Sequence, residues 1–222
     1  MIYTLTQPEW ESFFETSLTA TAAAIKSMGR AKFLAVINER FYHHQFSNYL
    51  FQYFREKQID IWTQHILFPE AKTPQSFTWR EVALADARQT RQQAVGKGVK
   101  GNYDFLLNTT PPICLEWKGP NVYSVADVAQ VMLKLFSRQP DATIKIFSAV
   151  ITSSQTGNAR HLEAIESYFR QGLQFALDVL EISPHQLAAK NLYAYIATLP
   201  DDRMVKYHWG RLTAIPVSSA RF

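Results

Sequence analysis

The hydrophobic positions of this chain recur at helical spacing in some segments and as short apolar runs in others, with turn residues between them. A capping box with a proline in the first turn, Thr6-Gln7-Pro8-Glu9, predicts where the first helix begins. The segments that we expect to be helical are 7–28, 31–57, 80–94, 124–137, 158–180 and 184–190. Runs rich in β-branched and aromatic residues predict strands over 59–68, 103–107, 113–117, 143–152, 192–198 and 204–217.

The helix predicted over 124–137 has a clear apolar stripe and stands between two predicted strands. A strand, a helix and a strand in succession favour a crossover connection and a partly parallel sheet. We therefore expect an α/β fold of mixed α+β character, with a central mixed β-sheet flanked by helices. At 222 residues the chain is most simply one domain, with N-terminal helices over 1–57 and a sheet-and-helix core over 58–222.

A β-hairpin is the most informative local pattern. Two apolar runs, 103–107 and 113–117, flank a turn that contains Pro111 and Pro112. Proline has no N–H to give to a β-ladder, so the two prolines mark the point where the chain reverses. If the turn is centred on Thr110, paired residues lie equally far from Thr110 on either side.

That register places Asp104 directly opposite Glu116. Because side chains alternate between the faces of a strand, Glu116 and Lys118 share one face with Cys114, which we interpret as a small packing residue. Two facing carboxylates repel each other and require a compensating cation, either a divalent metal or the Lys118 ammonium. Oxygen ligands favour Mg²⁺ or Mn²⁺.

Asp104 followed by Glu116-Trp117-Lys118 resembles the signature of the PD-(D/E)XK nuclease superfamily, an acid on one strand and an acid, any residue and a lysine on the next. Tyr103 stands where the family usually has proline. The resemblance spans about a quarter of the chain with the flanking helices, and it implies a restriction-endonuclease-like core. It also implies that Asp104 and Glu116 are metal ligands, that the Trp117 carbonyl is a further ligand, and that Lys118 orients or helps to deprotonate the attacking water.

Three further residues are candidates for supporting roles. Glu39 lies among apolar positions of a predicted helix, where a carboxylate requires a partner. The resemblance implies that Glu39 is a catalytic acid and metal ligand, and a structural salt bridge is the alternative. His43 follows one turn later and could serve a metal site or act as a general base, or pack as an ordinary histidine. Some superfamily members place a glutamine where Gln130 stands, yet Gln130 shares the polar side of its helix with Asp127 and Lys134, which favours a solvated face.

Composition places the chain among ordinary globular proteins, with 47% hydrophobic residues and a single cysteine, which excludes an intramolecular disulfide. No apolar stretch approaches the roughly 20 residues of a membrane span, and the first residues lack the layout of a signal peptide. We therefore expect a cytoplasmic protein with no membrane partner.

The net charge of +4 suits a polyanionic partner. Arg88, Arg91, Lys97 and Lys100 form a basic run that leads into the hairpin, and Gly96 within it could bring backbone amides to a phosphate. A solvated helix face explains the two arginines equally well.

These observations favour a Mg²⁺-dependent endo- or exodeoxyribonuclease that acts on DNA, with RNA as an open alternative. Restriction, repair, recombination and defence against mobile DNA all use this chemistry. A homodimer is one option, because cutting both strands of a duplex often takes two active sites. The rival interpretation is a catalytically inactive nucleic-acid-binding or protein-interaction module on the same fold.

Overall fold

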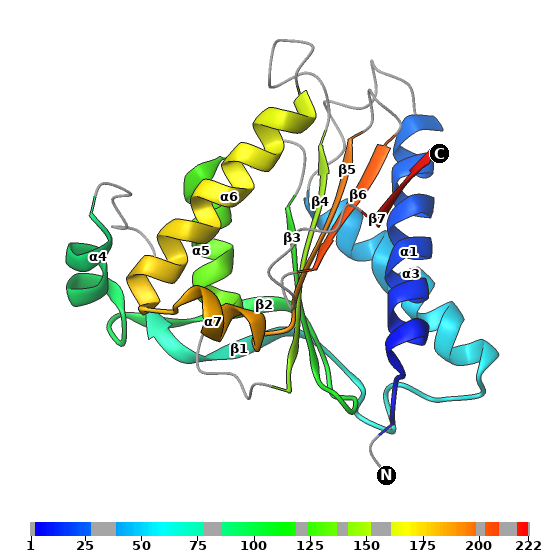
Figure 1. Ribbon diagram of the computed structural model, residues 1–222. Coiled ribbons are helices and arrows are strands. Elements are labelled where there is room, and N and C mark those ends of the chain that lie inside the picture. The colour runs from blue at the N-terminus through cyan, green and yellow to red at the C-terminus, as the bar shows by residue number, and fades with distance from the viewer. Residues whose placement is uncertain are drawn as a thin grey trace.

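The computed structural model describes residues 3–27, 39–77, 86–118, 124–136, 142–151, 161–198, 203–208 and 217–221. These residues form three layers, a central sheet with helices on both faces (Figure 1). One face carries α1 (Gln7–Ser27) and α3 (Glu39–Glu56). The other face carries α4 (Ala87–Ala94), α5 (Val125–Leu135), α6 (His161–Leu180) and α7 (Pro184–Ala188). No helix within the described ranges is both long enough and apolar enough to cross a membrane.

The strands form one seven-stranded sheet whose spatial order is the order of the sequence. They are β1 (Leu67–Phe77), β2 (Val99–Leu107), β3 (Ile113–Lys118), β4 (Ile144–Ile151), β5 (Leu192–Thr198), β6 (Arg203–His208) and β7 (Val217–Arg221). β3, β4 and β5 are parallel, and every other neighbouring pair is antiparallel. The predicted α/β fold with a mixed sheet and flanking helices is therefore confirmed, including the crossover through α5.

An apolar cluster lies on each face of the sheet. The first, which we call the N-terminal core, packs α1 and α3 against the sheet and includes Trp10, Phe46, Phe105, Leu115 and Trp117. The second, which we call the crossover core, packs α5 and α6 against the other face and includes Tyr103, Cys114, Val128, Phe147 and Phe169. In β3 the alternation is as predicted, because Leu115 and Trp117 enter the N-terminal core while Cys114 is buried in the crossover core.

Most predicted elements have their counterpart in the structure. Parts of the helices predicted over 31–57, 80–94 and 158–180, and of the strand predicted over 204–217, lie outside the described residues. The capping contact predicted for the first helix is present, and a second cap stands at the start of α5. The Glu9 carboxylate accepts hydrogen bonds from the N–H and hydroxyl of Thr6, and Ser124 and Asp127 form a reciprocal capping box at the start of α5.

The strand predicted over 59–68, ahead of Pro69, is wrong. Residues 57–66 form turns and irregular backbone, and β1 begins at Leu67 and continues through Pro69 and Pro74. β1 is at the edge of the sheet, and β2 is its one neighbouring strand among the described residues, although its end also forms an isolated bridge between Phe77 and Val95. A proline in an edge strand can leave its missing N–H on the open side. The register with β2 shifts between Lys72 and Ser76, in the stretch that contains Pro74.

The crossover helices α5 and α6 are in close contact at Gly172. A Cβ atom built on Gly172 would lie 2.7 Å from the Cβ and Cγ1 of Val128 and 2.8 Å from the carbonyl oxygen of Val125. Both neighbours belong to the helix that faces the hairpin. The absence of a side chain at Gly172 therefore sets how closely α6 holds α5 against the sheet.

Replacing Gly172 with alanine should destabilise the protein by about 1–3 kcal/mol through overpacking. In an unconstrained helix interior the same change would stabilise by up to about 1 kcal/mol, so the sign of the effect is diagnostic. Urea unfolding measures it, with Gln171→Ala on the exposed side of α6 as the matched control. A Gly172→Ala protein at least as stable as the wild type would contradict the close contact with Val128.

Candidate metal centre

The hairpin of β2 and β3 pairs in the predicted register. Phe105 pairs with Leu115, Leu106 with Cys114 and Leu107 with Ile113. One more step in this register would pair Asp104 with Glu116, and the Asp104 charge does act on Glu116. No further ladder pair joins the described residues of β2 and β3 beyond Phe105 and Leu115, and the Oδ2 atom of Asp104 instead accepts a hydrogen bond from the Trp117 N–H at 2.6 Å. The Asp104 carboxylate thus accepts a β3 backbone hydrogen bond that a backbone carbonyl of β2 would accept in a regular ladder.

β2 changes its orientation around Asp104. Tyr103 lies in the crossover core and Phe105 in the N-terminal core, although residues two apart in a regular strand share a face. The Tyr103 hydroxyl donates a hydrogen bond to the Lys134 carbonyl of α5, which fixes that side of the break. Asp104 therefore stands at a break in the alternation, where its carboxylate can be reached from the α3 side of the sheet as well as from β3.

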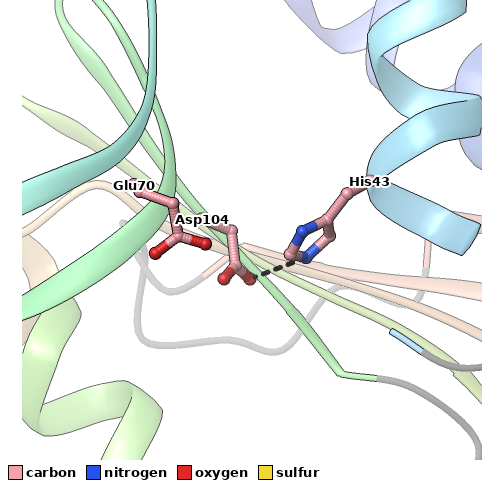
Figure 2. A group of neighbouring side chains, drawn as sticks. All are labelled: His43, Glu70 and Asp104. Atoms are coloured by element: carbon pink, nitrogen blue, oxygen red, sulfur yellow. Dashed lines mark ion pairs between the residues drawn. The ribbon is translucent and has the colours of Figure 1, made fainter. Parts of the chain in front are cut away.

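His43 and Glu70 meet Asp104 on the side of the sheet that faces α3. Figure 2 shows the two carboxylates side by side, with the His43 ring approaching from the helix. One potential ligand atom from each of the three residues lies within 4.8 Å of the others, and His43 Nε2 is 3.5 Å from Asp104 Oδ2. An imidazole nitrogen and two carboxylates are common metal ligands. The His43, Glu70 and Asp104 side chains could hold a metal ion.

Glu70 reaches this position through an unusual backbone conformation. It has a φ of 53° and lies between the Pro69–Phe105 and Ala71–Tyr103 ladder pairs, which sets it across from Asp104. The side-chain amide of Asn102 donates a hydrogen bond to Glu70 Oε2 at 3.0 Å. Glu70 was not among the predicted site residues, because the strand was expected to end before Pro69 and no motif in the chain marks this acid.

The buried polar side-chain atoms that have no hydrogen-bond partner among the described residues include His43 Nε2 and Glu116 Oε1. Buried nitrogen and oxygen atoms in proteins are nearly always paired, so each unpaired atom requires an explanation. Both are the kinds of atom that bind divalent metals, and both come from groups that adjoin Asp104 in space or in register. The residues present therefore fit a cation.

Glu116 is compensated by a lysine that the helical pattern placed on a solvated face. The Glu116 side chain is fully buried, and its Oε2 atom accepts a hydrogen bond from Lys134 Nζ at 2.8 Å. The expectation that Lys134 lies on a solvated face is wrong, since its side chain is only 18% exposed. The helical wheel correctly identifies the polar side of α5. In the folded protein, however, Lys134 on that side faces Glu116 at the end of the β2–β3 hairpin and not the solvent. Gln130, one turn before Lys134, is half-buried, and its supporting role stays a prediction.

The two acids of the hairpin differ in their ionisation. Burial raises the pKa of Glu116 to about 8, and the neighbouring Asp104 charge adds to this effect, while Lys134 and Lys118 only partly offset it. For Asp104, burial also opposes ionisation, but the His43 ring, the Trp117 N–H and the Lys134 ammonium outweigh it and hold the Asp104 pKa below its usual value. Without a metal, Asp104 therefore loses its proton at a lower pH than Glu116 does.

The remaining residues of the predicted signature occupy the end of β3. Lys118 is half-buried and level with Ala149 of β4, and its charge acts on Glu116. The Trp117 ring is buried in the N-terminal core and stacks on Tyr42 at 5.9 Å, as expected of a core residue. The Glu39 side chain lies outside the described residues, so its role as a ligand stays a prediction.

The basic run before the hairpin divides into two groups. Arg88, Lys97 and Lys100 are exposed, and the nearby Gly96 has a φ of 78° with open space where a side chain would be. Arg91 is half-buried and forms an ion pair with Glu181 at the end of α6. The structure thus leaves three of the four basic residues accessible to a phosphate, and Arg91 links α4 to α6.

Comparison with known proteins identifies no relative. No protein-family model matches the chain, and no match is found among curated proteins or solved structures. The function of the centre must therefore be argued from the geometry of this chain.

The pKa of Glu116 predicts how stability depends on pH in the absence of divalent metal. Because the pKa is about 8 in the folded protein against 4.5 as the ordinary value, the folded state binds this proton more tightly than the unfolded state does. The resulting stability is fully present below pH 4.5 and is lost as the pH rises through about 8. Urea unfolding in EDTA should therefore show the wild type losing stability relative to Glu116→Gln over this range. A constant difference between the two proteins would show that Glu116 titrates as an ordinary acid.

Proposed function

We propose that this protein is a metal-dependent nuclease that hydrolyses phosphodiester bonds in DNA, with RNA as an open alternative. The observation that carries the proposal is the end of the β2–β3 ladder. There the Asp104 carboxylate holds the Trp117 N–H, and the buried Glu116 level with it keeps one oxygen without a hydrogen-bond partner among the described residues. The mixed sheet with the acids on a hairpin also agrees with what the resemblance to the PD-(D/E)XK superfamily implies.

The metal of this proposal is Mg²⁺ or Mn²⁺, held by Asp104 and Glu116 with the Trp117 carbonyl and Glu39 as further candidates. A bound divalent ion lowers the pKa of its water and neutralises charge that develops on the scissile phosphate. The buried position of Glu116 suits this role, because a carboxylate surrounded by protein attracts a cation more strongly than one in water does.

The protein side chains have distinct tasks in the proposed reaction. Lys118 shares the β3 face of Glu116, and we assign its ammonium to positioning the attacking water and contacting a phosphate oxygen. The Trp117 N–H fixes the Asp104 carboxylate at the end of the hairpin. Lys134 holds Glu116 in place through one carboxylate oxygen and leaves the other to a ligand.

One observation favours the rival function, an inactive nucleic-acid-binding or protein-interaction module. The Lys134 ammonium already compensates the buried Glu116 charge, so the hairpin has a partner for this acid without any metal. In such a module the acids are structural, and the accessible Arg88, Lys97 and Lys100 provide the affinity for phosphates.

A cleavage assay separates the two functions. Supercoiled plasmid and end-labelled duplex, branched and single-stranded DNA are incubated with Mg²⁺, Mn²⁺ or EDTA, alongside an RNA substrate. We expect metal-dependent cleavage that Asp104→Ala combined with Glu116→Ala abolishes. If the wild type cleaves none of these substrates with either metal, the nuclease proposal is refuted and the binding-module interpretation takes its place.

Lys118→Met should reduce cleavage by about 10²-fold or more, since a group that acts on the transferred proton contributes on this scale. Metal binding should stay within a few-fold of the wild-type value, because Asp104 and Glu116 remain. Single-turnover cleavage and calorimetric metal titration measure the two effects separately. Lys57→Met removes the same charge at the far end of α3, where Lys57 pairs with Glu9, and is the control. Wild-type cleavage by Lys118→Met would refute the assigned role.

The two groups of basic residues should respond differently to salt when DNA binds. Alanine at Arg88, Lys97 or Lys100 should reduce the slope of log affinity against log salt concentration by about one unit for each phosphate that the variant no longer binds. Arg91→Ala should leave the slope unchanged, because Arg91 pairs with Glu181. Fluorescence anisotropy at several salt concentrations provides the slopes. Equal slopes for the wild type and the first three variants would identify the run as an ordinary solvated surface.

A further inference from the structure

We propose that His43, Glu70 and Asp104 form a second cation position that shares Asp104 with the Asp104–Glu116 pair and prefers Mn²⁺ to Mg²⁺. The inference rests on the proposed function in one respect, since it takes Asp104 and Glu116 as ligands of the first ion. The new elements are Glu70, which no sequence pattern singles out, and the role of His43.

The three residues come from separate elements, His43 from α3, Glu70 from β1 and Asp104 from β2, and Asp104 lies between the other two (Figure 2). Ligand bonds of about 2.1 Å place neighbouring donor atoms of one ion about 3.0–3.4 Å apart. His43 Nε2 and Asp104 Oδ2 are 3.5 Å apart, close to that separation, yet Nε2 has no hydrogen-bond partner among the described residues. This separation slightly exceeds that of two ligands of one ion, so a small movement of either side chain would let both bind a common ion.

Each of the three side chains is held in place by a specific feature. Asp104 stands at the break in β2 alternation and is fixed by the Trp117 N–H. Glu70 adopts positive φ and accepts a hydrogen bond from Asn102, which orients its carboxylate. The His43 ring packs edge-on against Phe105 at a centroid distance of 5.4 Å. Three independent constraints thus direct three donors to one place.

The position is distinct from the one that Glu116 serves. His43 lies on the α3 side of the sheet, where it packs on Phe105 of the N-terminal core. Glu116 pairs with Lys134 of α5, on the side of the crossover core. Asp104 stands between the two sides, and its carboxylate has two oxygens. A two-ion centre that shares one carboxylate follows, an arrangement known to suit phosphodiester hydrolysis.

The imidazole determines which ion the second position prefers. Mg²⁺ favours ligand sets made of oxygen and gives up its water reluctantly. Transition ions such as Mn²⁺ accept an imidazole nitrogen together with carboxylates, and Zn²⁺ does so more strongly. The Asp104–Glu116 position offers oxygen ligands from its side chains, so the two positions should differ in selectivity.

Mn²⁺ binding to the intact chain, without nucleic acid, tests the inference. Electron paramagnetic resonance of free Mn²⁺ and calorimetry should count two ions per chain for the wild type and one for His43→Gln or Glu70→Gln. In competition, displacing the ion of the His43 position should need at least about 10-fold more Mg²⁺ than displacing the other. His44→Gln, which changes the exposed neighbouring histidine, is the matched control and should bind two ions.

The outcomes separate this inference from the proposed function. Two ions in the wild type and one in each variant, in a protein that cleaves nothing, would keep the second position and refute the nuclease. One ion that is insensitive to His43→Gln and Glu70→Gln but absent from Asp104→Ala with Glu116→Ala would overturn the second position alone. No bound Mn²⁺ would overturn both. Glu70 is exposed on the edge strand, so Glu70→Gln keeps the test decisive if His43→Gln does not fold.

Discussion

The electrostatic repulsion between Asp104 and Glu116 is the constraint on which the rest of this structure depends. The two acids follow the last ladder pair of the β2–β3 hairpin, the Asp104 charge acts on Glu116, and Glu116 has no exposed surface at all. Charges in such surroundings must be balanced by nearby groups, because water cannot do so. Each helical layer places a nitrogen group beside one of the acids, α5 Lys134 beside Glu116 and α3 His43 beside Asp104. The sheet brings the two acids together, and side chains from the helices lower the electrostatic cost of their proximity.

The same packing that builds the two cores also positions these balancing groups. α5 is held against the sheet by α6 through the contact at Gly172, and this fixes the distance between Lys134 and Glu116. On the other face, Phe46 of α3 packs against both Phe105 and Trp117, so His43, one turn earlier, is anchored beside Asp104. The candidate centre is therefore placed by buried helix and strand contacts, which hold side chains more firmly than a surface loop would.

Sequence patterns predicted those parts of the centre that depend on local rules. The hairpin register follows from two prolines in the turn and from period-two alternation, so the pairing of Phe105 with Leu115, next to the two acids, could be predicted from the sequence alone. Glu70 could not be predicted, because its place depends on a long-range pairing of β1 with β2 and on positive φ at a residue that is not glycine. The prediction for Lys134 is wrong for a related reason. Periodicity identifies the polar side of a helix but does not show what that side faces in the folded protein.

β1 combines a place at the border of the sheet with two exposed prolines, Pro69 and Pro74, on either side of Glu70. An unpaired strand normally invites another chain to add a strand of its own, which is how many sheets associate or aggregate. Each proline removes one donor from that border and interrupts the regular backbone that strand addition requires. Self-association through β1 is thereby disfavoured, and a second copy of the chain would have to dock elsewhere. Glu70 therefore lies on a stretch of the sheet border where the addition of another strand is disfavoured.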